Sequence, residues 1–461
     1  MSGKMRPRMT AWVPDLSRKN GPKYLALAEA LTAAIGSGKL APGARLPPQR
    51  ELAQILGFDL TTITRAYNVA RQRGLIDGRG KAGSFVRETA LHSINAAAQV
   101  DTGLNTPPVP PCGILERAMK EAFELALGQS ASSLLQYQSA AGDQAICRAG
   151  ADLAARVGLR TEADRIVLAA GGQNALLAIS RAALAPGARV ACGEYVYPGF
   201  RAIASRSGLE LVPLPTMTAD ALELACRQHQ VSALYVVPTN DNPTGATIPL
   251  SERQRIAKVA ERHGLKIIED DAYGLLPRNP LPAISSLVPQ QSWYILSTSK
   301  IISPALRIAF VSAPTVADTL QLAAEVHDTA VMPPPLNAAM VAVWLREGTF
   351  DNLVAAVRAE AEWRSDLARR VLTDHAISSH AQGYHVWVRL PEGASASALS
   401  QQLAAAGVGA IPSDRFAAGK GSAQALRISL GGAAPRSTVE AALRQLAAHL
   451  SLRDVEQAGL L

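Results

Sequence analysis

Short β-branched runs alternate with helical stretches over most of this chain after residue 100. The runs lie at residues 166–168, 189–191, 233–237, 266–268, 293–296 and 308–312. Strands that alternate with helices pair in parallel, because each helix carries the chain back across a face of the sheet. The pattern therefore predicts an α/β fold with a mostly parallel sheet. In such sheets, ligands bind beyond the carboxyl ends of the strands.

The excess positive charge of the chain lies in its first 88 residues. These residues carry 15 Lys and Arg against 6 Asp and Glu, a net charge of +9, whereas the remaining 31 basic and 32 acidic residues nearly cancel. A basic unit of this size indicates a polyanionic partner, foremost nucleic acid; a solvated basic surface is the alternative. We expect a DNA-binding domain at residues 1–88, a linker at 89–100 and a second domain at 101–461.

The composition of the 461-residue chain is typical of a globular protein, with 48% hydrophobic and 18% charged residues. No uncharged apolar run is long enough to span a membrane, and the N-terminus lacks the apolar segment of a signal peptide. The four cysteines form no CxxC pair and indicate reduced, structural residues. We expect a cytoplasmic protein that contacts no membrane and binds no metal.

The spacing of apolar residues in the basic N-terminal domain predicts helices and two short strands. The expected helices begin at Tyr24, Pro47 and Thr61, and the expected strands lie at residues 75–76 and 84–86. The second and third helices join at a short turn centred on Gly57, as in a helix-turn-helix. Arg79 and Lys81 lie in a glycine-rich loop between the strands, where a basic wing would contact phosphates or the minor groove.

Three motifs in this domain resemble the winged-helix domain of the GntR family of bacterial regulators. They are LPPQRELA at residues 46–53, TTITRAY at 61–67 and GLI at 74–76. The resemblance implies double-stranded promoter DNA as a partner. The residues that it assigns to DNA are Arg45 and Arg50 on the backbone and, near the start of the recognition helix, Thr61, Thr62, Thr64 and Arg65.

Leu60 departs from the pattern of that family, which often has an arginine or another polar residue at this position. A leucine cannot bind a guanine edge as an arginine does. We expect Leu60 to pack against its own domain, with contact to a thymine methyl group as the alternative.

Lys300 ends the motif STSK at residues 297–300, and Arg307 follows seven residues later. A lysine amine condenses with an aldehyde where its site favours the neutral form. The hydroxyl groups before Lys300 and the guanidinium after it suit a phosphate. An aldehyde and a phosphate on one small molecule suggest pyridoxal 5'-phosphate (PLP), although an isolated lysine is usually a solvated surface charge.

Other polar groups also follow predicted strands. The sequence GGQN at residues 171–174 opens a helix whose backbone amides would bind a phosphate. Tyr197 would stack on a flat ring, Asn242 would donate to a phenolic oxygen, and Asp270 would pair with a protonated pyridine nitrogen. Each has a plain structural alternative, such as a core tyrosine or a turn asparagine.

Taken together, these residues resemble the fold-type I PLP enzymes of the aspartate aminotransferase group, over residues 101–461. The resemblance implies a smaller C-terminal α/β subdomain and a Schiff base, the internal aldimine, between Lys300 and the cofactor. The other cofactor contacts that it implies are Gly172, Gln173, Tyr197, Asn242, Asp270, Tyr273, Ser297, Ser299 and Arg307, with Tyr137 from the partner subunit of a homodimer. Arg427 matches the arginine that binds a substrate carboxylate. Ala170 stands where many relatives have a serine, so one hydroxyl contact to the phosphate is in doubt.

A GntR-like domain before an aminotransferase-like domain resembles the MocR-type transcriptional regulators. The resemblance implies a PLP-dependent regulator that senses an amino acid or related amine by aldimine exchange at Lys300, or that senses PLP itself. The alternative is an aminotransferase with an accessory DNA-binding domain, and a half-reaction of that type stays open. A second domain that served only for dimerisation would have no use for Lys300 and Asp270. The identity of the effector, the operator sequence and the sign of regulation do not follow from the sequence.

Overall fold

The chain forms two compact units, Met1–Gln99 and Val100–Leu461, hereafter the head and the body. The computed structural model describes residues 12–14, 22–36, 39–41, 43–72, 75–78, 83–87, 104–139, 141–405, 407–419 and 423–457. The predicted linker at residues 89–100, Arg79 and Lys81 lie outside the described residues.

The described part of the head is a winged helix-turn-helix, as predicted. Its elements are α1 (Lys23–Gly36), α2 (Gln49–Leu56), α3 (Leu60–Gln72) and the antiparallel strands β1 (Ile76–Gly78) and β2 (Ser84–Val86). Leu31, Leu52, Ile63 and Tyr67 lie in its core. The Tyr67 hydroxyl, buried among them, donates to the Pro47 carbonyl at 2.9 Å.

Two local features fix the turn between α2 and α3. Gly57 ends α2 in the left-handed conformation, with φ 63° and ψ 32°, which a glycine adopts without steric cost. Asp59 accepts a hydrogen bond from the Thr61 amide at 2.7 Å, which satisfies one donor at the start of α3. The Thr61 hydrogen bonds also lower the pKa of Asp59.

The body is built on a mixed sheet with the strand order β3-β9-β8-β7-β6-β4-β5. The strands are β3 (Ile166–Ala169), β4 (Arg189–Gly193), β5 (Glu210–Leu214), β6 (Ala233–Val236), β7 (Lys266–Asp270), β8 (Ser292–Ser297) and β9 (Ala309–Ser312). The neighbours from β5 to β8 pair in parallel, and β9 pairs antiparallel with both β8 and β3. The predicted mostly parallel sheet is therefore confirmed.

Strand β5 was not predicted from the sequence. It lies at the edge of the sheet, and its Pro213 and half-exposed residues interrupt the apolar run that marks the central strands.

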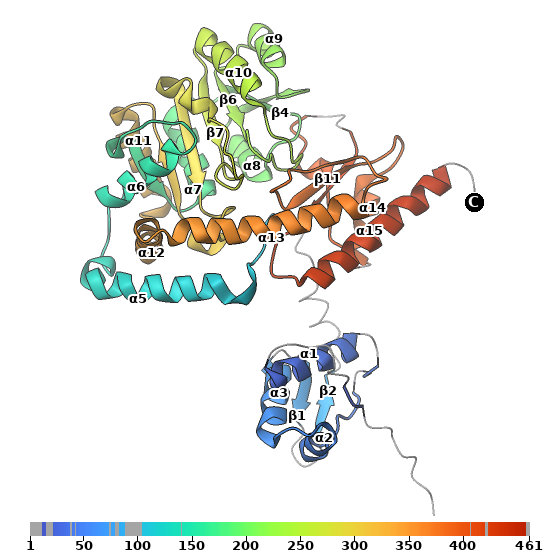
Figure 1. The fold of residues 1–461 in the computed structure, drawn as a ribbon. Helices are drawn as coiled ribbons and strands as arrows, with labels where there is room; N and C mark the ends of the chain where they lie inside the picture. The colour runs from blue at the N-terminus through green and yellow to red at the C-terminus, as the bar shows by residue number, and fades with distance from the viewer. Residues whose placement is uncertain are drawn as a thin grey trace, which may run out of the picture. The chain divides into compact units, whose positions relative to one another are not determined.

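Helices cover both faces of this sheet (Figure 1). One face packs on α7 (Gly172–Ala183), α8 (Pro198–Arg206) and α11 (Val316–Ala330). The other packs on α6 (Gln144–Ala155), α9 (Ala219–His229), α10 (Leu250–His263) and α12 (Pro335–Arg346). Two long helices, α5 (Ile114–Leu134) and α13 (Thr349–Val371), extend the core below the sheet in Figure 1.

A smaller C-terminal subdomain completes the body, as predicted. Its antiparallel sheet has the order β10-β11-β13-β12, with β10 (Ile377–Ser378), β11 (His385–Arg389), β12 (Ile411–Pro412) and β13 (Ala425–Ser429). Helices α14 (Ala396–Ala405) and α15 (Arg436–Gln457) accompany it. Among the residues that the structure describes, no helix is both long and apolar enough to cross a bilayer.

Candidate functional site

The predicted cofactor residues gather at the carboxyl edge of the large sheet. Asp270 and Ser297 are the last residues of β7 and β8, and Asn242 follows β6. Because these three strands pair in parallel, their ends point to the same edge. Residues far apart in the sequence thereby come together.

The start of α7 and Arg307 form a cradle for an anion. The Arg307 guanidinium donates to the Ala170 carbonyl at 2.8 Å, and a Cβ on Gly171 would lie 2.8 Å from this guanidinium. Arg307 itself has a left-handed backbone, with φ 51°, which is uncommon for residues other than glycine and indicates a functional constraint. Backbone amides at the first turn of α7 add donors and the positive end of the helix dipole.

Two serines complete this cradle. Ser297 Oγ accepts a hydrogen bond from the Ser299 amide at 3.3 Å and lies 3.8 Å from where a Cβ on Gly172 would stand. Among the described residues, the buried Ser299 Oγ has no hydrogen-bond partner. A buried hydroxyl without a partner costs free energy, so the site suits a ligand that supplies an acceptor.

The side chains of Gln173 and Tyr197 both pack close to Gly199. A Cβ on Gly199 would stand 2.3 Å from Gln173 Oε1 and 2.4 Å from the Tyr197 ring, so glycine is needed for this approach. Burial raises the pKa of Tyr197, and the Asp270 carboxylate raises it further. The ring is therefore neutral and available for stacking.

Asp270 is the one carboxylate of the sequence Glu269-Asp270-Asp271 that is directed to the site. Burial raises its pKa to about 6, while the nearby Lys300 ammonium lowers it. Tyr235, from β6, donates to Asp270 Oδ2 at 3.1 Å and stacks on Phe200. A cation such as a protonated pyridine nitrogen would favour the charged carboxylate.

Lys300 and Tyr273 both form a hydrogen bond with Asn105, a residue that the sequence did not indicate as part of the site. The Lys300 ammonium donates to the backbone carbonyl of Asn105, and the Asn105 side-chain amide donates to the Tyr273 hydroxyl at 2.8 Å. His385 also contacts this amide. Asn105 and Tyr235 belong to no motif that suggests PLP chemistry, so only their positions reveal them.

Arg427 of β13 lies beside Asn242. Its guanidinium is buried and donates to Asn242 Oδ1 at 3.2 Å. The Phe416 ring lies 5.4 Å from the guanidinium carbon. The Arg427 guanidinium thus lies next to the Asn242 amide, which is expected to contact the ring hydroxyl of PLP.

Tyr137 is the predicted cofactor residue that lies on the surface of the single chain. It follows α5 and is 83% exposed. Its predicted role needs a second subunit and stays a prediction.

The predicted DNA contacts of the head differ in their surroundings. Arg45 and Arg50 are exposed, and Thr62 is partly exposed. Thr61 Oγ1 donates to Asp59, and Thr64 Oγ1 donates to Gln49 Oε1 at 2.9 Å. Arg65 lies over the Tyr24 ring at 4.5 Å, which directs it toward α1.

Leu60 keeps 39% of its surface exposed at the start of α3. The expected packing is therefore partial, and part of this leucine is accessible at the start of the recognition helix.

The residues at the sheet edge fit PLP. They supply an anion cradle with an unpaired hydroxyl, a buried carboxylate for the ring nitrogen and a lysine amine in one connected cluster. Lys300 and Asp270 interact electrostatically, as do Tyr197 and Arg307.

Comparison with known proteins agrees with this geometry. Residues 100–446 match the family Aminotransferase class I and II, and residues 23–86 match the family Bacterial regulatory proteins, gntR family. The HTH-type transcriptional regulator YdeF of Bacillus subtilis is 30% identical, over 93% of this chain and 94% of its own length. The 2-aminoadipate transaminase of Thermus thermophilus is 29% identical, over 70% of this chain and 83% of its own length.

A solved structure shows the same relationship for the body. LysN, an α-aminoadipate aminotransferase of Thermus thermophilus solved with N-(5'-phosphopyridoxyl)-L-leucine, has a TM-score of 0.69 and 25% identity, over 77% of this chain and 92% of that one. These matches confirm the predicted cofactor, pyridoxal phosphate. The chain belongs to the aminotransferase class I and II family and, with its gntR-family head, to the MocR-type transcriptional regulators.

Proposed function

We propose that this regulator detects an amino acid or a related primary amine at Lys300 and transmits its binding to promoter DNA. Bound PLP supplies an aldehyde carbon that reacts with primary amines and a ring that withdraws electrons. The observation that carries the proposal is the position of Arg427, 2% exposed and hydrogen-bonded to Asn242, in the cluster that contains Lys300. A buried guanidinium suits the carboxylate of an amino acid, which it can bind through two hydrogen bonds.

The protein also offers a hydrogen-bond acceptor to the Lys300 amine after an effector amine has displaced it from PLP. The Asn105 carbonyl accepts a hydrogen bond from Lys300, so the released amine has a partner within the protein. A coupling free energy of roughly 1–3 kcal/mol between effector and DNA would change promoter affinity about 5- to 150-fold.

PLP itself is a second candidate signal, because the same residues would hold it. Aminotransferase activity is a third function, favoured by the transaminase relatives and by the presence of every residue of the predicted cofactor set. The basic winged helix favours regulation, since amino transfer needs no DNA-binding domain.

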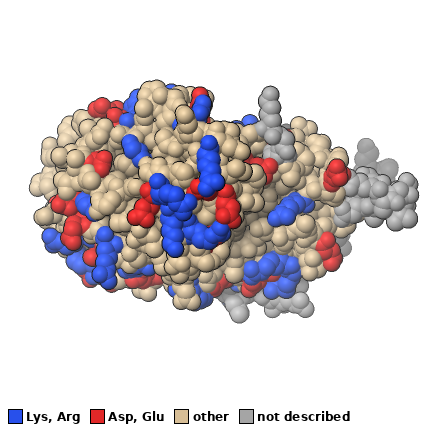
Figure 2. All heavy atoms as spheres, turned by 90° about the horizontal axis from the view of Figure 1, so that it is seen from above, with Lys and Arg blue, Asp and Glu red and all other residues tan. Residues whose placement is uncertain are grey.

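The DNA-binding surface that we propose is on the head. Arg50 is exposed on α2, and Arg45 lies beside Gly83, close to the wing. On the face of the body that Figure 2 shows, by contrast, basic and acidic side chains stand next to one another. Arg255 pairs with Asp220 and Arg262 with Glu223, for example, between α9 and α10. Such paired charges do not form a surface for phosphates.

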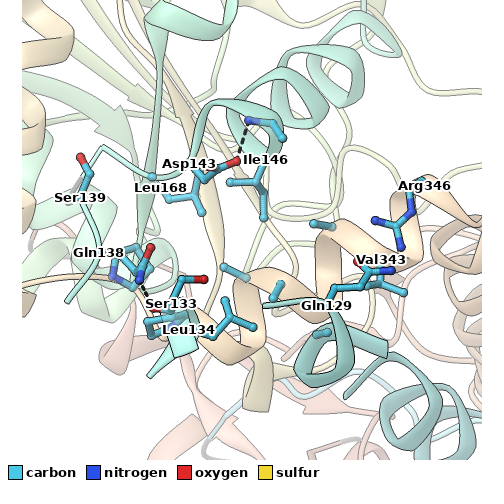
Figure 3. A pocket seen from close by; sticks show the side chains of 18 residues that line it. Gln129, Ser133, Leu134, Gln138, Ser139, Asp143, Ile146, Leu168, Val343 and Arg346 are labelled. Carbon is cyan, nitrogen blue, oxygen red and sulfur yellow. Dashed lines mark hydrogen bonds between the residues drawn. The ribbon is translucent and has the colours of Figure 1, made fainter. Parts of the chain in front are cut away.

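A homodimer would complete the cofactor site, and one face of the body suits a second copy. Exposed apolar side chains occur on α5, on the loop after it and between α11 and α12; they are Phe123, Leu125, Leu135, Tyr137 and Val331. A hollow of about 340 Å³ opens on this face, with Leu134, Ile146 and Val343 around it (Figure 3). Val331 has φ 61°, a strained conformation for a β-branched residue. A partner that covers this face would bring its own Tyr137 to the phosphate.

Lys300→Ala should abolish the absorption band of lysine-bound PLP in the purified protein, because no other amine occupies this position. The control is Lys258→Ala, which removes an exposed lysine of α10 and should keep the band. An unchanged spectrum in Lys300→Ala would refute the assignment of this lysine.

Arg50→Ala should weaken binding to promoter DNA severalfold and lower the slope of log affinity against log salt by about one, because one phosphate contact is lost. PLP absorbance should not change. Arg444→Ala, an exposed arginine of α15, is the control. If neither wild type nor variant binds DNA in a gel shift at moderate salt, the proposed regulation fails.

Arg427→Ala should raise the concentration of an amino acid needed to shift the PLP spectrum by about tenfold or more, since a charged hydrogen bond contributes about 1.5–3 kcal/mol. The decarboxylated amine of the same compound should show no such change. Arg389→Ala, on the neighbouring strand, is the matched control. An equal response of wild type and Arg427→Ala to carboxylated amines would mean that another group anchors the effector.

Leu135→Asp should shift the protein toward monomers in analytical ultracentrifugation, because it places a charge in the proposed apolar interface. Leu320→Asp, at an equally exposed position on α11, should stay dimeric. Tyr137→Phe should keep the dimer but weaken PLP binding about tenfold through the lost hydrogen bond. A wild-type monomer that binds PLP tightly would contradict the shared site.

A further inference from the structure

The first described segment after the head enters the cofactor site. It runs from Leu104 to Pro110, and its second residue, Asn105, is 2% exposed. In the sequence, this segment directly follows the stretch that joins the head to the body. Asn105 follows Arg87, the last described residue of the head, by 18 positions in the sequence.

Asn105 contacts both the cofactor residues and the C-terminal subdomain. Its backbone carbonyl accepts from Lys300, and its side-chain amide donates to Tyr273 at 2.8 Å. Its Oδ1 accepts from the Ser429 hydroxyl of β13 at 3.0 Å. The second N–H of its amide meets His385 Nδ1 of β11 at 2.9 Å. Every polar group of the side chain thus has a partner.

The histidine fixes the orientation of this amide. His385 Nε2 lies 2.9 Å from the Asp241 carbonyl, so Nε2 carries the proton and Nδ1 accepts. Burial lowers the pKa of His385 to about 3 and keeps the ring neutral. Asn105 must therefore donate both of its N–H groups, one to His385 and one to Tyr273.

The rest of the segment is fixed to the turn between β13 and α15. The Gly432 amide donates to the Thr106 carbonyl, and the Val109 amide donates to the Gly432 carbonyl, both at 3.2 Å. A Cβ on Gly431 would lie only 1.6 Å from Thr106 O, so this approach requires glycine.

A buried arginine holds the turn itself. Arg364 of α13 donates to the carbonyls of Leu430 at 2.7 Å and Ala434 at 2.8 Å and pairs with Glu360. The turn that binds Thr106 and Val109 is therefore itself anchored to α13.

We propose that Asn105 is a positioning residue that couples the state of the Lys300 amine to the segment leading to the DNA-binding head. The inference rests on the proposed function, in which an amine exchanges with Lys300. When the Lys300 nitrogen is bonded elsewhere, the buried Asn105 carbonyl loses its charged donor. An unpaired buried carbonyl is unfavourable, so residues 104–110 adjust or loosen. When the lysine amine is released, the hydrogen bond forms again.

Amide hydrogen exchange of the full chain, with and without PLP, tests this coupling. In the wild type, loading with PLP should speed exchange severalfold in peptides that cover residues 104–113. PLP-free Lys300→Ala should show the fast rate already, because the donor is absent. In Asn105→Ala, residues 104–113 should exchange fast with and without PLP, and the two exchange rates should differ by less than twofold. Asn352→Ala, an exposed asparagine of α13, should behave as the wild type.

Ser429→Ala removes the donor to Asn105 Oδ1 and the acceptor of the Gly431 amide. This variant carries the test if Asn105→Ala does not fold, and its response to PLP should also be reduced. The proposal is overturned if PLP binds and residues 104–113 do not respond in the wild type, or if both variants respond as the wild type does. The proposed function is judged separately, by DNA affinity on a duplex selected from a random pool. If DNA affinity responds to PLP or amines while residues 104–113 do not, the proposed function stands and this inference fails. If DNA affinity ignores both, the proposed function fails.

Discussion

The parallel pairing of β6, β7 and β8 is the constraint on which the rest of the site depends. Its register places Asp270 opposite Ile295 and Val236 opposite Glu269, so the chain emerges from all three strands at one edge. Asn242, Asp270 and Lys300 follow these strands and meet there, although long crossover helices separate them in the sequence. The helix that follows β3 contributes the anion cradle from the same side. The common direction of these strands thus brings the ring contacts, the phosphate contacts and the lysine to one edge of the sheet.

The neighbours of Asp270 show how a structure selects one carboxylate from three. Glu269 accepts hydrogen bonds from the amides of Ile284 and Ser285 at 2.9 and 2.6 Å. Asp271 accepts from the Tyr294 hydroxyl at 3.1 Å. Glu269 therefore binds the backbone of the segment at Ile284 and Ser285, and Asp271 binds a side chain of β8, whereas Asp270 faces the cofactor residues and is supported by Tyr235. The electrostatics of the site depend on this division, because a buried carboxylate stays charged only beside a cation or sufficient donors.

Sequence reasoning could predict the parts of the molecule that leave a local signal. Apolar runs between helices predicted the central strands, and polar residues directly after them suggested the candidate cofactor residues. Strand β5 lacked that signal because it is a half-exposed edge strand with a proline. Asn105 and Tyr235 were missed because their roles arise from contacts across the fold, and an asparagine before two prolines resembles any loop. The DNA contact of Arg65 stays a prediction from its motif; in the structure this exposed side chain lies over the Tyr24 ring.

The central claim is that amine exchange at Lys300 changes the affinity for DNA. The most direct measurement titrates PLP-loaded protein with amino acids and amines while recording the cofactor spectrum and DNA affinity in the same samples. The account predicts at least one compound that changes both signals with one midpoint, and predicts that DNA shifts this midpoint, since coupling between two binding sites is reciprocal. It also predicts that Lys300→Ala loses both responses. A DNA response that persists in Lys300→Ala, or amines that change the spectrum and never the DNA affinity, would contradict it.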